Sequence, residues 1–380
     1  MPNYSGVWTL QAQMQAKAAG LWTLQGVNNL WSWGSNIFGE LGQNNLIYRS
    51  SPVQVGLLTT WSKVSAGYNS SLATKTDGTL WSWGRNNQGQ LGQNNTIYRS
   101  SPVQVGALTT WLNISSTYDS CLAAKTDGTL WSWGYNYYGK LGDNTTIHRS
   151  SPVQVGLLTT WSKVSVGNYS CLATKTDGTL WSWGQNTQGQ LGDNTVINRS
   201  SPVQIGTLTT WSNISVGSAS CLATKTDGTL WSWGTNGAGQ LGQNIAYTIN
   251  RSSPVQVGAL TTWSNVSVGT QSCLATKTDG TLWSWGQNNY GQLGQNIAYT
   301  INRSSPVQVG LLSTWSNVSA GVYSCLATKT DGTLWAWGWN TYGQLGQSDV
   351  INRSSPIQVG TSTTWSNISV GYSSLATQSY

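Results

Sequence analysis

The chain has 380 residues, of which only 8% are charged, while 44 are glycine and 24 are tryptophan. No stretch is long and apolar enough for a membrane-spanning helix, which argues against a helical membrane protein. The formal net charge is +7, but the excess comes from one Arg in each of seven dispersed repeats. No Lys/Arg run forms the basic tail that follows a nucleic-acid backbone.

Residues 1–20 differ from the rest of the chain and are predicted to form a separate attachment segment. Leu10, Met14 and Ala18 are spaced four apart between a capping Thr and a terminating Gly, so residues 9–19 are expected to form a short amphipathic helix. Its apolar face is expected either to dock on the rest of the chain or to attach to another protein. The segment has no basic start and no apolar core run, so no Sec-type signal peptide is expected.

Three sequence landmarks recur seven times each in the rest of the chain. The first Trp of Leu-Trp-Ser/Ala-Trp-Gly stands at Trp31, Trp81, Trp131, Trp181, Trp231, Trp283 and Trp335. Arg-Ser-Ser-Pro begins at Arg49, Arg99, Arg149, Arg199, Arg251, Arg303 and Arg353. A Trp preceded by two hydroxyl residues stands at Trp61, Trp111, Trp161, Trp211, Trp263, Trp315 and Trp365. Seven copies with a period of 50 to 52 residues predict seven structural units.

Each unit contains four strand-like runs, here called strands A to D in chain order. In the unit that starts at Trp111 they are predicted at residues 111–115, 120–125, 129–133 and 152–155. Asp-Gly separates strands B and C in six units, which predicts a two-residue type I′ hairpin turn. Four short antiparallel strands repeated seven times predict an all-β fold, a seven-bladed β-propeller over residues 21–380.

The Trp residues and the chain ends indicate how this propeller is built. Of the 24 Trp, 21 stand at three repeated positions, so they are predicted to form the core between blades rather than a ligand site. The repeats begin with a C and D pair and end with an A and B pair, so one blade is predicted to take strands from both termini. Residues 21–25 and 374–377 both resemble strand B of that blade, and the pattern leaves the choice open.

Cysteines and charged residues at repeated positions are predicted to be structural. Cys121, Cys171, Cys221, Cys273 and Cys325 share one slot of successive units, too far apart for disulfides, and are expected to be free and buried. The seven Arg are expected to pack on Trp and bond loop carbonyls of their own blade, with anion binding as the alternative. Asp143 and Asp193 are expected to be solvated, with calcium ligation as the alternative. No metal centre is expected.

The run Gly-x-x-Ser-Cys-Leu-Ala-Thr-Lys-Thr-Asp-Gly-Thr-Leu-Trp-Ser-Trp-Gly-x-Asn-x-x-Gly-Gln-Leu-Gly at residues 167–192 resembles the repeat of the regulator of chromosome condensation (RCC1) family. The resemblance extends from residue 21 to the end and independently implies a seven-bladed propeller. The family usually has His two residues before the Leu-Ala of strand B, where this chain has Ser70, Ser120, Ser170, Ser220, Ser272, Ser324 and Ser373. The basic, chromatin-engaging tail of the eukaryotic member is also missing, so the resemblance does not imply nucleotide exchange on a Ran-type GTPase.

A second resemblance concerns the start of the chain. Residues 5–22 look like a short segment found in virion structural proteins of marine tailed phages. Together with the weakly charged body rich in Gly, Asn, Ser and Thr, this resemblance implies a phage virion or tail-fibre component.

Because the repeats are near copies, the positions at which they differ can be read from this one chain. The differences concentrate after strand A, after strand C and before Arg-Ser-Ser-Pro. In an up-and-down four-stranded blade the A–B and C–D connections emerge on one face, and the B–C and D–A connections on the other. The differing segments are therefore predicted to share one face, opposite the invariant Asp-Gly turns.

These differing segments are rich in Tyr among Asn, Ser, Gln and Gly, which is typical of adaptable recognition surfaces. Neutral drift after duplication would explain the variability but not the surplus of Tyr. The predicted ligand-binding residues are Phe38, Tyr68, Tyr118, Tyr135, Tyr137, Tyr138, Tyr169, Tyr290, Tyr323, Trp339, Tyr342 and Tyr372.

Catalysis is not expected, because an enzyme needs an asymmetric set of acid, base and nucleophile. The single His is His148, six of the 11 acidic residues stand in the Asp-Gly turns, and no cofactor motif is present. The leading interpretation is a non-catalytic protein that binds a cell-surface protein or glycan through the Tyr-rich face. It would be displayed on a virion through residues 1–20, with no nucleic acid bound and no membrane insertion.

Two other interpretations remain open. One is a cytoplasmic RCC1-like interaction propeller that regulates a partner such as a GTPase or an enzyme. The other is a purely structural capsid or fibre component, in which residues 1–20 make the important contacts.

Overall fold

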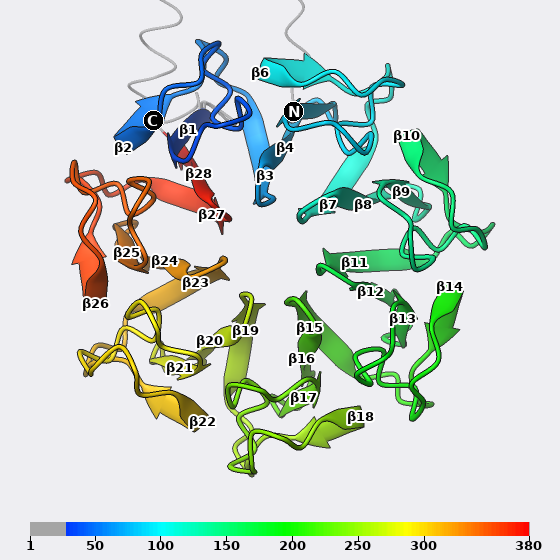
Figure 1. The fold of residues 1–380 in the computed structure, drawn as a ribbon, viewed down its shortest axis with the longest axis vertical. Coiled ribbons are helices and arrows are strands. Elements are labelled where there is room, and N and C mark those ends of the chain that lie inside the picture. The colour runs from blue at the N-terminus through cyan, green and yellow to red at the C-terminus, as the bar shows by residue number, and fades with distance from the viewer. Residues whose placement is uncertain (1–27, 380) are drawn as a thin grey trace, which may run out of the picture.

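The computed structural model describes residues 28–379, which form seven four-stranded antiparallel sheets around a central channel (Figure 1). In one blade, β7 (Trp111–Ser116) lines the channel as strand A, and β8 (Ser120–Lys125), β9 (Leu130–Gly134) and β10 (Arg149–Gln154) follow outward. The predicted seven-bladed propeller is confirmed. The helix predicted over residues 9–19 and the boundary at residue 20 lie outside the described residues and stay predictions.

The remaining blades repeat this pattern. Five of them contain β3 (Trp61–Ala66), β4 (Ser70–Lys75), β5 (Leu80–Gly84) and β6 (Arg99–Gln104); β11 (Trp161–Val166), β12 (Ser170–Lys175), β13 (Leu180–Gly184) and β14 (Arg199–Gln204); β15 (Trp211–Val216), β16 (Ser220–Lys225), β17 (Leu230–Gly234) and β18 (Arg251–Gln256); β19 (Trp263–Val268), β20 (Ser272–Lys277), β21 (Leu282–Gly286) and β22 (Arg303–Gln308); and β23 (Trp315–Ala320), β24 (Ser324–Lys329), β25 (Leu334–Gly338) and β26 (Arg353–Gln358). Strand D thus starts at the Arg of Arg-Ser-Ser-Pro, three residues before the predicted start. Within residues 28–379 no helix has the length and hydropathy that crossing a bilayer requires.

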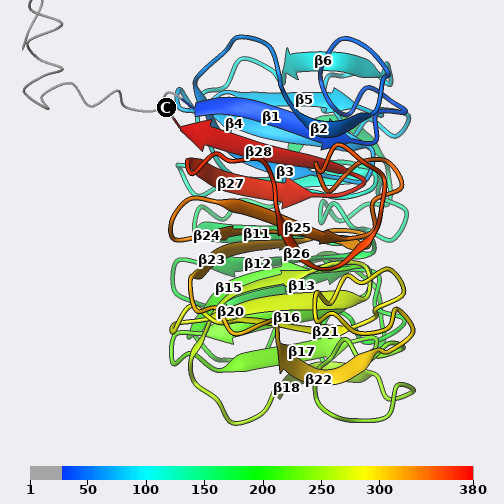
Figure 2. The same cartoon turned by 90° about the vertical axis from the view of Figure 1, so that its left-hand side faces the viewer.

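The seventh blade joins the two ends of the described chain. It contains β27 (Trp365–Val370), β28 (Ser373–Ser379), β1 (Asn28–Gly34) and β2 (Arg49–Gln54), ordered β2-β1-β28-β27. Figure 2 shows β28 lying beside β1, and the two strands pair from Asn28 with Ser379 to Gly34 with Ser373. The predicted closure by both termini is confirmed. Strand B of this blade is β28, which contains residues 374–377, the second of the two candidate segments.

The turn between strands B and C is not the predicted type I′ turn. The Gly78 N–H donates to the Lys75 carbonyl (2.9 Å) and the Lys75 N–H donates to the Thr79 carbonyl (3.0 Å). Gly78 has a φ of +77°, but Asp77 does not have a positive φ. This is a three-residue loop, a type I turn followed by a left-handed Gly. Asp77 is held there because its carboxylate accepts from the Thr79 N–H (2.9 Å) and hydroxyl (2.7 Å).

The core lies between successive blades, where Trp side chains from strands A and C of the same blade pack edge to face. Trp161 of strand A lies 5.8 Å from Trp181 and 6.2 Å from Trp183, measured between ring centroids. Leu122 and Leu130 of the preceding blade cover the same cluster. The prediction that the repeated Trp form the core is therefore confirmed.

One backbone carbonyl in each C–D loop ties that loop to the next blade. The Lys140 carbonyl accepts from the Trp183 indole N–H (2.9 Å) and from the Cys171 thiol (3.3 Å). In one of the two blades without the cysteine, the Ser71 hydroxyl donates to the Glu40 carbonyl (2.9 Å). The five cysteines are free and buried, as predicted. Burial raises the pKa of Cys171 to about 12, so its thiol keeps the proton that it donates.

Strand A of each blade is also bonded to strand A of the next by a repeated Ser. The Ser65 hydroxyl accepts from the Ser116 N–H (2.9 Å), and the Ser369 hydroxyl accepts from the Ala66 N–H (2.8 Å). The same bond occurs at all seven junctions. The channel wall is consequently a closed, hydrogen-bonded ring.

Candidate functional site

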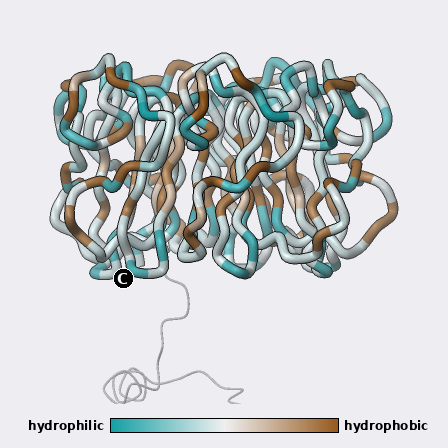
Figure 3. The backbone as a smooth tube through the Cα atoms, turned by 90° about the horizontal axis from the view of Figure 1, so that it is seen from below, coloured by the Kyte–Doolittle hydropathy of each residue, from teal (hydrophilic) through white to brown (hydrophobic). Residues whose placement is uncertain are grey.

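The A–B and C–D connections lie on one face of the ring, here called the variable face; Figure 3 shows the ring edge-on, with connecting loops along both faces. Each C–D loop begins with a bond to the A–B loop of its own blade, as in the Tyr135 N–H to Asp119 carbonyl bond (2.8 Å). On the opposite face the B–C turns bond the D–A loops, as in the Thr126 N–H to Thr110 carbonyl bond (2.9 Å). The topology thus places all the differing segments together, as predicted.

Five of the predicted aromatic residues form one contact network around Trp339. The Trp339 ring lies 5.1 Å from Tyr342, 5.9 Å from Tyr290 and Tyr372, and 6.0 Å from Tyr323. Tyr290 and Tyr323 also contact each other at 4.9 Å. These rings come from A–B and C–D loops of neighbouring blades, so the network crosses blade junctions.

This network continues into the next blades through Tyr372. Tyr68 lies 5.4 Å from Tyr372 and 5.3 Å from Tyr118. The Arg85 guanidinium then lies over both Tyr118 (5.0 Å) and Phe38 (5.5 Å). We call this continuous surface the aromatic crescent, made of Phe38, Tyr48, Tyr68, Arg85, Tyr98, Tyr118, Tyr290, Tyr323, Trp339, Tyr342 and Tyr372.

The other predicted residues lie apart from the crescent. Tyr135, Tyr137 and Tyr138 contact one another, and Tyr135 also lies 4.8 Å from His148. We call these four residues the tyrosine patch. Tyr137 is 62% exposed. Tyr169 is exposed and has no aromatic contact among residues 28–379, so the twelve predicted residues form two patches and one isolated ring rather than one site.

Tyr68 has a role that its sequence position did not indicate. Its hydroxyl lies 3.1 Å from the Thr270 hydroxyl and accepts from the Asn168 side-chain amide (2.9 Å). Those partners belong to other blades, so Tyr68 spans the mouth of the channel on the variable face. Its ring belongs to the crescent, but its hydroxyl group is hydrogen-bonded within the protein.

Two charged residues in the loops of the variable face, Lys140 and Asp119, were not among the predicted site residues. Lys140 is almost fully buried, its ammonium donates to the Asn168 carbonyl (2.9 Å), and burial lowers its pKa to about 8. Asp119 accepts from the Gln90 amide (3.0 Å), and burial raises its pKa against the opposing effect of Arg85. The sequence did contain a sign that Lys140 is unusual, because five other repeats have Gln at the equivalent position.

Among residues 28–379 no repeated Arg lies over a Trp ring, but each bonds within its own loop as expected, Arg353 to the Ile351 carbonyl (3.1 Å) and the others to side chains. Arg149 donates to the Asp143 carboxylate (2.9 Å), and Arg99 donates to the Gln93 side-chain carbonyl (3.2 Å). In every repeat the partner is a Gln or Asp of the same C–D loop. These Arg therefore brace their own loops.

The described part of the chain contains no group of three or more His, Cys, Asp or Glu placed to hold a metal ion. The expectation that Asp143 and Asp193 are solvated is wrong, because their side chains are only 5% exposed and pair with Arg149 and Arg199. The Asp143 carboxylate accepts from Arg149, Thr145 and Asn136.

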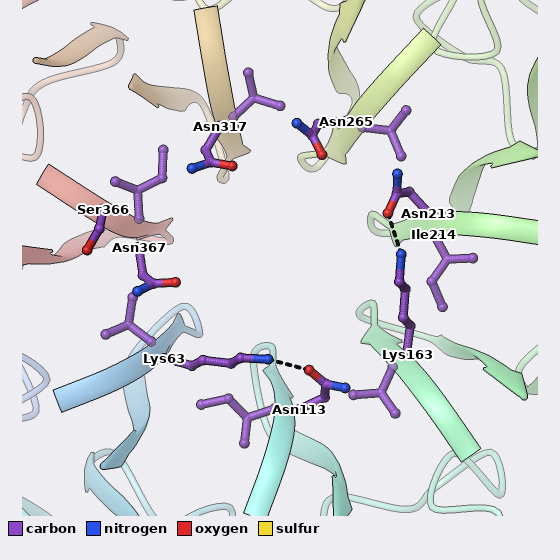
Figure 4. Close-up of a pocket in the computed structure, with 15 residues that line it drawn as sticks. Lys63, Asn113, Lys163, Asn213, Ile214, Asn265, Asn317, Ser366 and Asn367 are labelled. Carbon is purple, nitrogen blue, oxygen red and sulfur yellow. Dashed lines mark hydrogen bonds between the residues drawn. The ribbon is translucent and has the colours of Figure 1, made fainter. Parts of the chain in front are cut away.

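A second feature missed from the sequence is the channel itself. Its wall carries one polar side chain per blade at equivalent positions of strand A (Figure 4): Lys63, Asn113, Lys163, Asn213, Asn265, Asn317 and Asn367. The sequence did contain a sign of this set, since Lys occupies two of the seven equivalent positions and Asn occupies the other five.

The fold and the variable face define a closed seven-bladed propeller that carries its differing residues at one end. The model for the RCC1-like domain matches residues 9–258, and the RCC1 repeat matches residues 279–328 and 331–376. The chain therefore belongs to the regulator of chromosome condensation (RCC1) family.

Similar proteins share parts of the sequence or the whole fold. The chain is 38% identical over 86 residues to the human probable E3 ubiquitin-protein ligase HERC3, and 34% identical over 84 residues to the ultraviolet-B receptor UVR8 of Arabidopsis thaliana. Each match covers 22% of this chain, but only 8% of HERC3 and 19% of UVR8. The chain thus spans a fifth or less of these relatives.

Solved propellers match over nearly the full length. Human WBSCR16 superposes with a TM-score of 0.82 at 20% identity, covering 92% of this chain and 98% of that one. Yeast RCC1 (Prp20) in its complex with Kap60 gives 0.82 at 19% identity, covering 96% and 91%. At this identity the match establishes the fold.

Proposed function

We propose that the chain is a non-catalytic interaction propeller whose aromatic crescent is the docking surface for a protein partner. The observation that carries this proposal is the continuous contact network of Tyr, Trp and Arg across several blades of one face. Tyr, Trp and Arg are the residue types that dominate binding energy at protein interfaces. Most of the crescent rings are half-buried against each other, so little side-chain entropy is lost when a partner covers them.

A protein partner fits the crescent better than a small molecule does. Small-molecule sites are concave and enclose most of the ligand, whereas the crescent is spread over loops of successive blades. The yeast relative of this fold has been solved with Kap60 bound, which supports protein docking as a use of the architecture. These observations favour the interaction-propeller alternative over cell-surface glycan recognition.

Virion display remains a prediction. It depends on residues 1–22, which lie outside the described residues, and the relatives named above do not support it. Localisation, whether virion or cytoplasmic, is likewise untested.

The proposal is tested by variants on the two faces. The partner is first isolated by affinity capture on the wild-type chain, and its Kd is then measured. Trp339→Ala combined with Tyr342→Ala should weaken binding by about thirtyfold or more, because each ring is at the centre of the network. The tyrosine patch is tested separately with Tyr137→Ala, so that the contribution of each patch is resolved.

The matched control lies on the opposite face. Leu57 and Leu157 are 91% and 92% exposed in D–A loops, so Leu57→Ala with Leu157→Ala removes apolar area without touching the crescent. We expect this control to leave the Kd unchanged, and both double variants to melt near the wild-type temperature. Loss of binding in the control, or wild-type affinity in the Trp339 and Tyr342 variant, would refute the proposal.

A further inference from the structure

The channel contains a second candidate site, separate from the crescent. Strand A of every blade contributes to its wall, which encloses a cavity of about 400 Å³. A volume of this size is within the range of small-molecule sites, roughly 300 to 1,000 Å³. Polar side chains alternate around it with Val and Ile from the same strands (Figure 4).

The channel is constricted toward the variable face. Tyr68 crosses the mouth to Thr270 and Asn168 there. Below it the strand ends approach closely, since a Cβ on Gly167 would lie 2.1 Å from the Gly217 carbonyl oxygen. At the other end of strand A, Lys163 is exposed to solvent. A ligand would therefore enter from the Asp-Gly face.

The cavity is positively charged. Lys63 and Lys163 line it, and no carboxylate is among its lining residues. Each ammonium donates to a neighbouring Asn side-chain oxygen, Lys63 to Asn113 (2.6 Å) and Lys163 to Asn213 (2.7 Å). Burial lowers the pKa of both lysines. A bound anion would offset the cost of partly removing Lys63 from water, and at Lys163, which is exposed, it would add a direct charge interaction.

The rest of the cavity wall presents acceptors. The side-chain N–H groups of Asn265 and Asn367 donate to backbone carbonyls of the next blade, at 3.0 Å to Ser316 and 2.7 Å to Ser62. Their side-chain oxygens are consequently left for a ligand. Figure 4 shows Asn317 and Asn367 across the channel from Lys163, and Asn265 across the channel from Lys63.

We propose that the channel binds a small polyhydroxylated anion of the acidic-sugar class. Its acid group would lie on the side of Lys63 and Lys163, and its hydroxyl groups would donate to the side-chain oxygens of Asn265, Asn317 and Asn367. The Val and Ile side chains would pack against the C–H faces of the ring. This site does not depend on the partner proposed for the variable face.

Isothermal titration of the full chain with glucuronate, glucose 6-phosphate and neutral glucose tests the site. The test variant is Lys63→Asn with Lys163→Asn, which introduces the residue present at the five equivalent positions. The control is Lys75→Gln with Lys125→Gln. It removes the same charge outside the channel and introduces the residue found at the matching position, Gln378.

We expect saturable binding of one anionic sugar per chain, weakened about tenfold or more in the channel variant and unchanged in the control. Glucose should bind at least about tenfold more weakly than the better anion. Comparison of glucuronate with glucose 6-phosphate shows whether a carboxylate or a phosphate is preferred. Absence of binding by both anions, equal losses in the two double variants, or equal affinity for glucose would overturn the proposal.

Discussion

Replacing Leu375 with aspartate should open the ring and unfold the propeller under conditions in which the wild-type chain is folded. Leu375 is fully buried in β28, where it pairs with Ser32 of β1 and Ser369 of β27. Truncation of such a Leu costs about 2 to 5 kcal/mol, and a buried, unpaired carboxylate adds several more. The sum approaches the total stability of roughly 5 to 15 kcal/mol that domains possess. Urea unfolding followed by Trp fluorescence measures the loss.

The control for this variant lies in the same strand. Gln378 pairs with Trp365, at the position where other blades have a Lys whose ammonium lies over Trp rings, as Lys175 does at 3.5 Å from Trp181. Gln378→Lys should leave stability unchanged or raise it by about 0.5 to 1 kcal/mol. If Leu375→Asp unfolds at the wild-type urea concentration, β28 does not close the ring.

Replacing Lys140 with glutamine should stabilise the protein at pH 7 by about 3 kcal/mol, from the difference between the ordinary pKa of 10.5 and about 8 in the folded state. The lysine is 3% exposed, and burial without a paired carboxylate disfavours its charge. Glutamine is suitable, because Gln90 and Gln190 occupy the equivalent position in other blades. The free energy of unfolding in urea is the quantity to compare.

The pH dependence of the free energy of unfolding tests this prediction further, because its direction follows from the two pKa values. Between pH 8 and 10.5 the unfolded chain keeps the Lys140 proton while the folded chain releases it, so wild-type stability should rise with pH across this window. Below that window the penalty is constant. In Lys140→Gln the rise should be smaller than in the wild type, because other lysines with lowered pKa values still contribute to it, and the reverse change Gln190→Lys should enlarge it. Equal stability of wild type and Lys140→Gln at pH 7 would show that the buried charge is not costly.

The repeats explain why the fold was predictable. Each unit carries its own turn, strand and Trp signals, so seven local patterns suffice to predict seven blades and a closing blade shared by the termini. The position of the variable face followed from strand order alone. Even so, the local turn was misassigned, because the bond between Asp77 and Thr79 favours a conformation that the Asp-Gly pair does not reveal.

Contacts across the ring were not predictable, because they depend on how blades approach one another. Tyr68 and Thr270 are separated by 202 residues, and nothing local distinguishes Tyr68 from Tyr118. The division of the twelve aromatics into the crescent and the tyrosine patch depends in the same way on side-chain reach between loops. The sequence also did not reveal that strand A faces the channel, which places Lys63 and Lys163 on the channel wall.

We expect the variable face, and not the Asp-Gly face, to dock the protein partner. Amide hydrogen exchange of the full chain, measured with and without the captured partner, tests it directly. We predict slower exchange in the loops that carry Trp339, Tyr342 and Tyr372, and unchanged exchange in the Asp-Gly turns and at Leu57 and Leu157. Protection confined to those turns and D–A loops would contradict the claim.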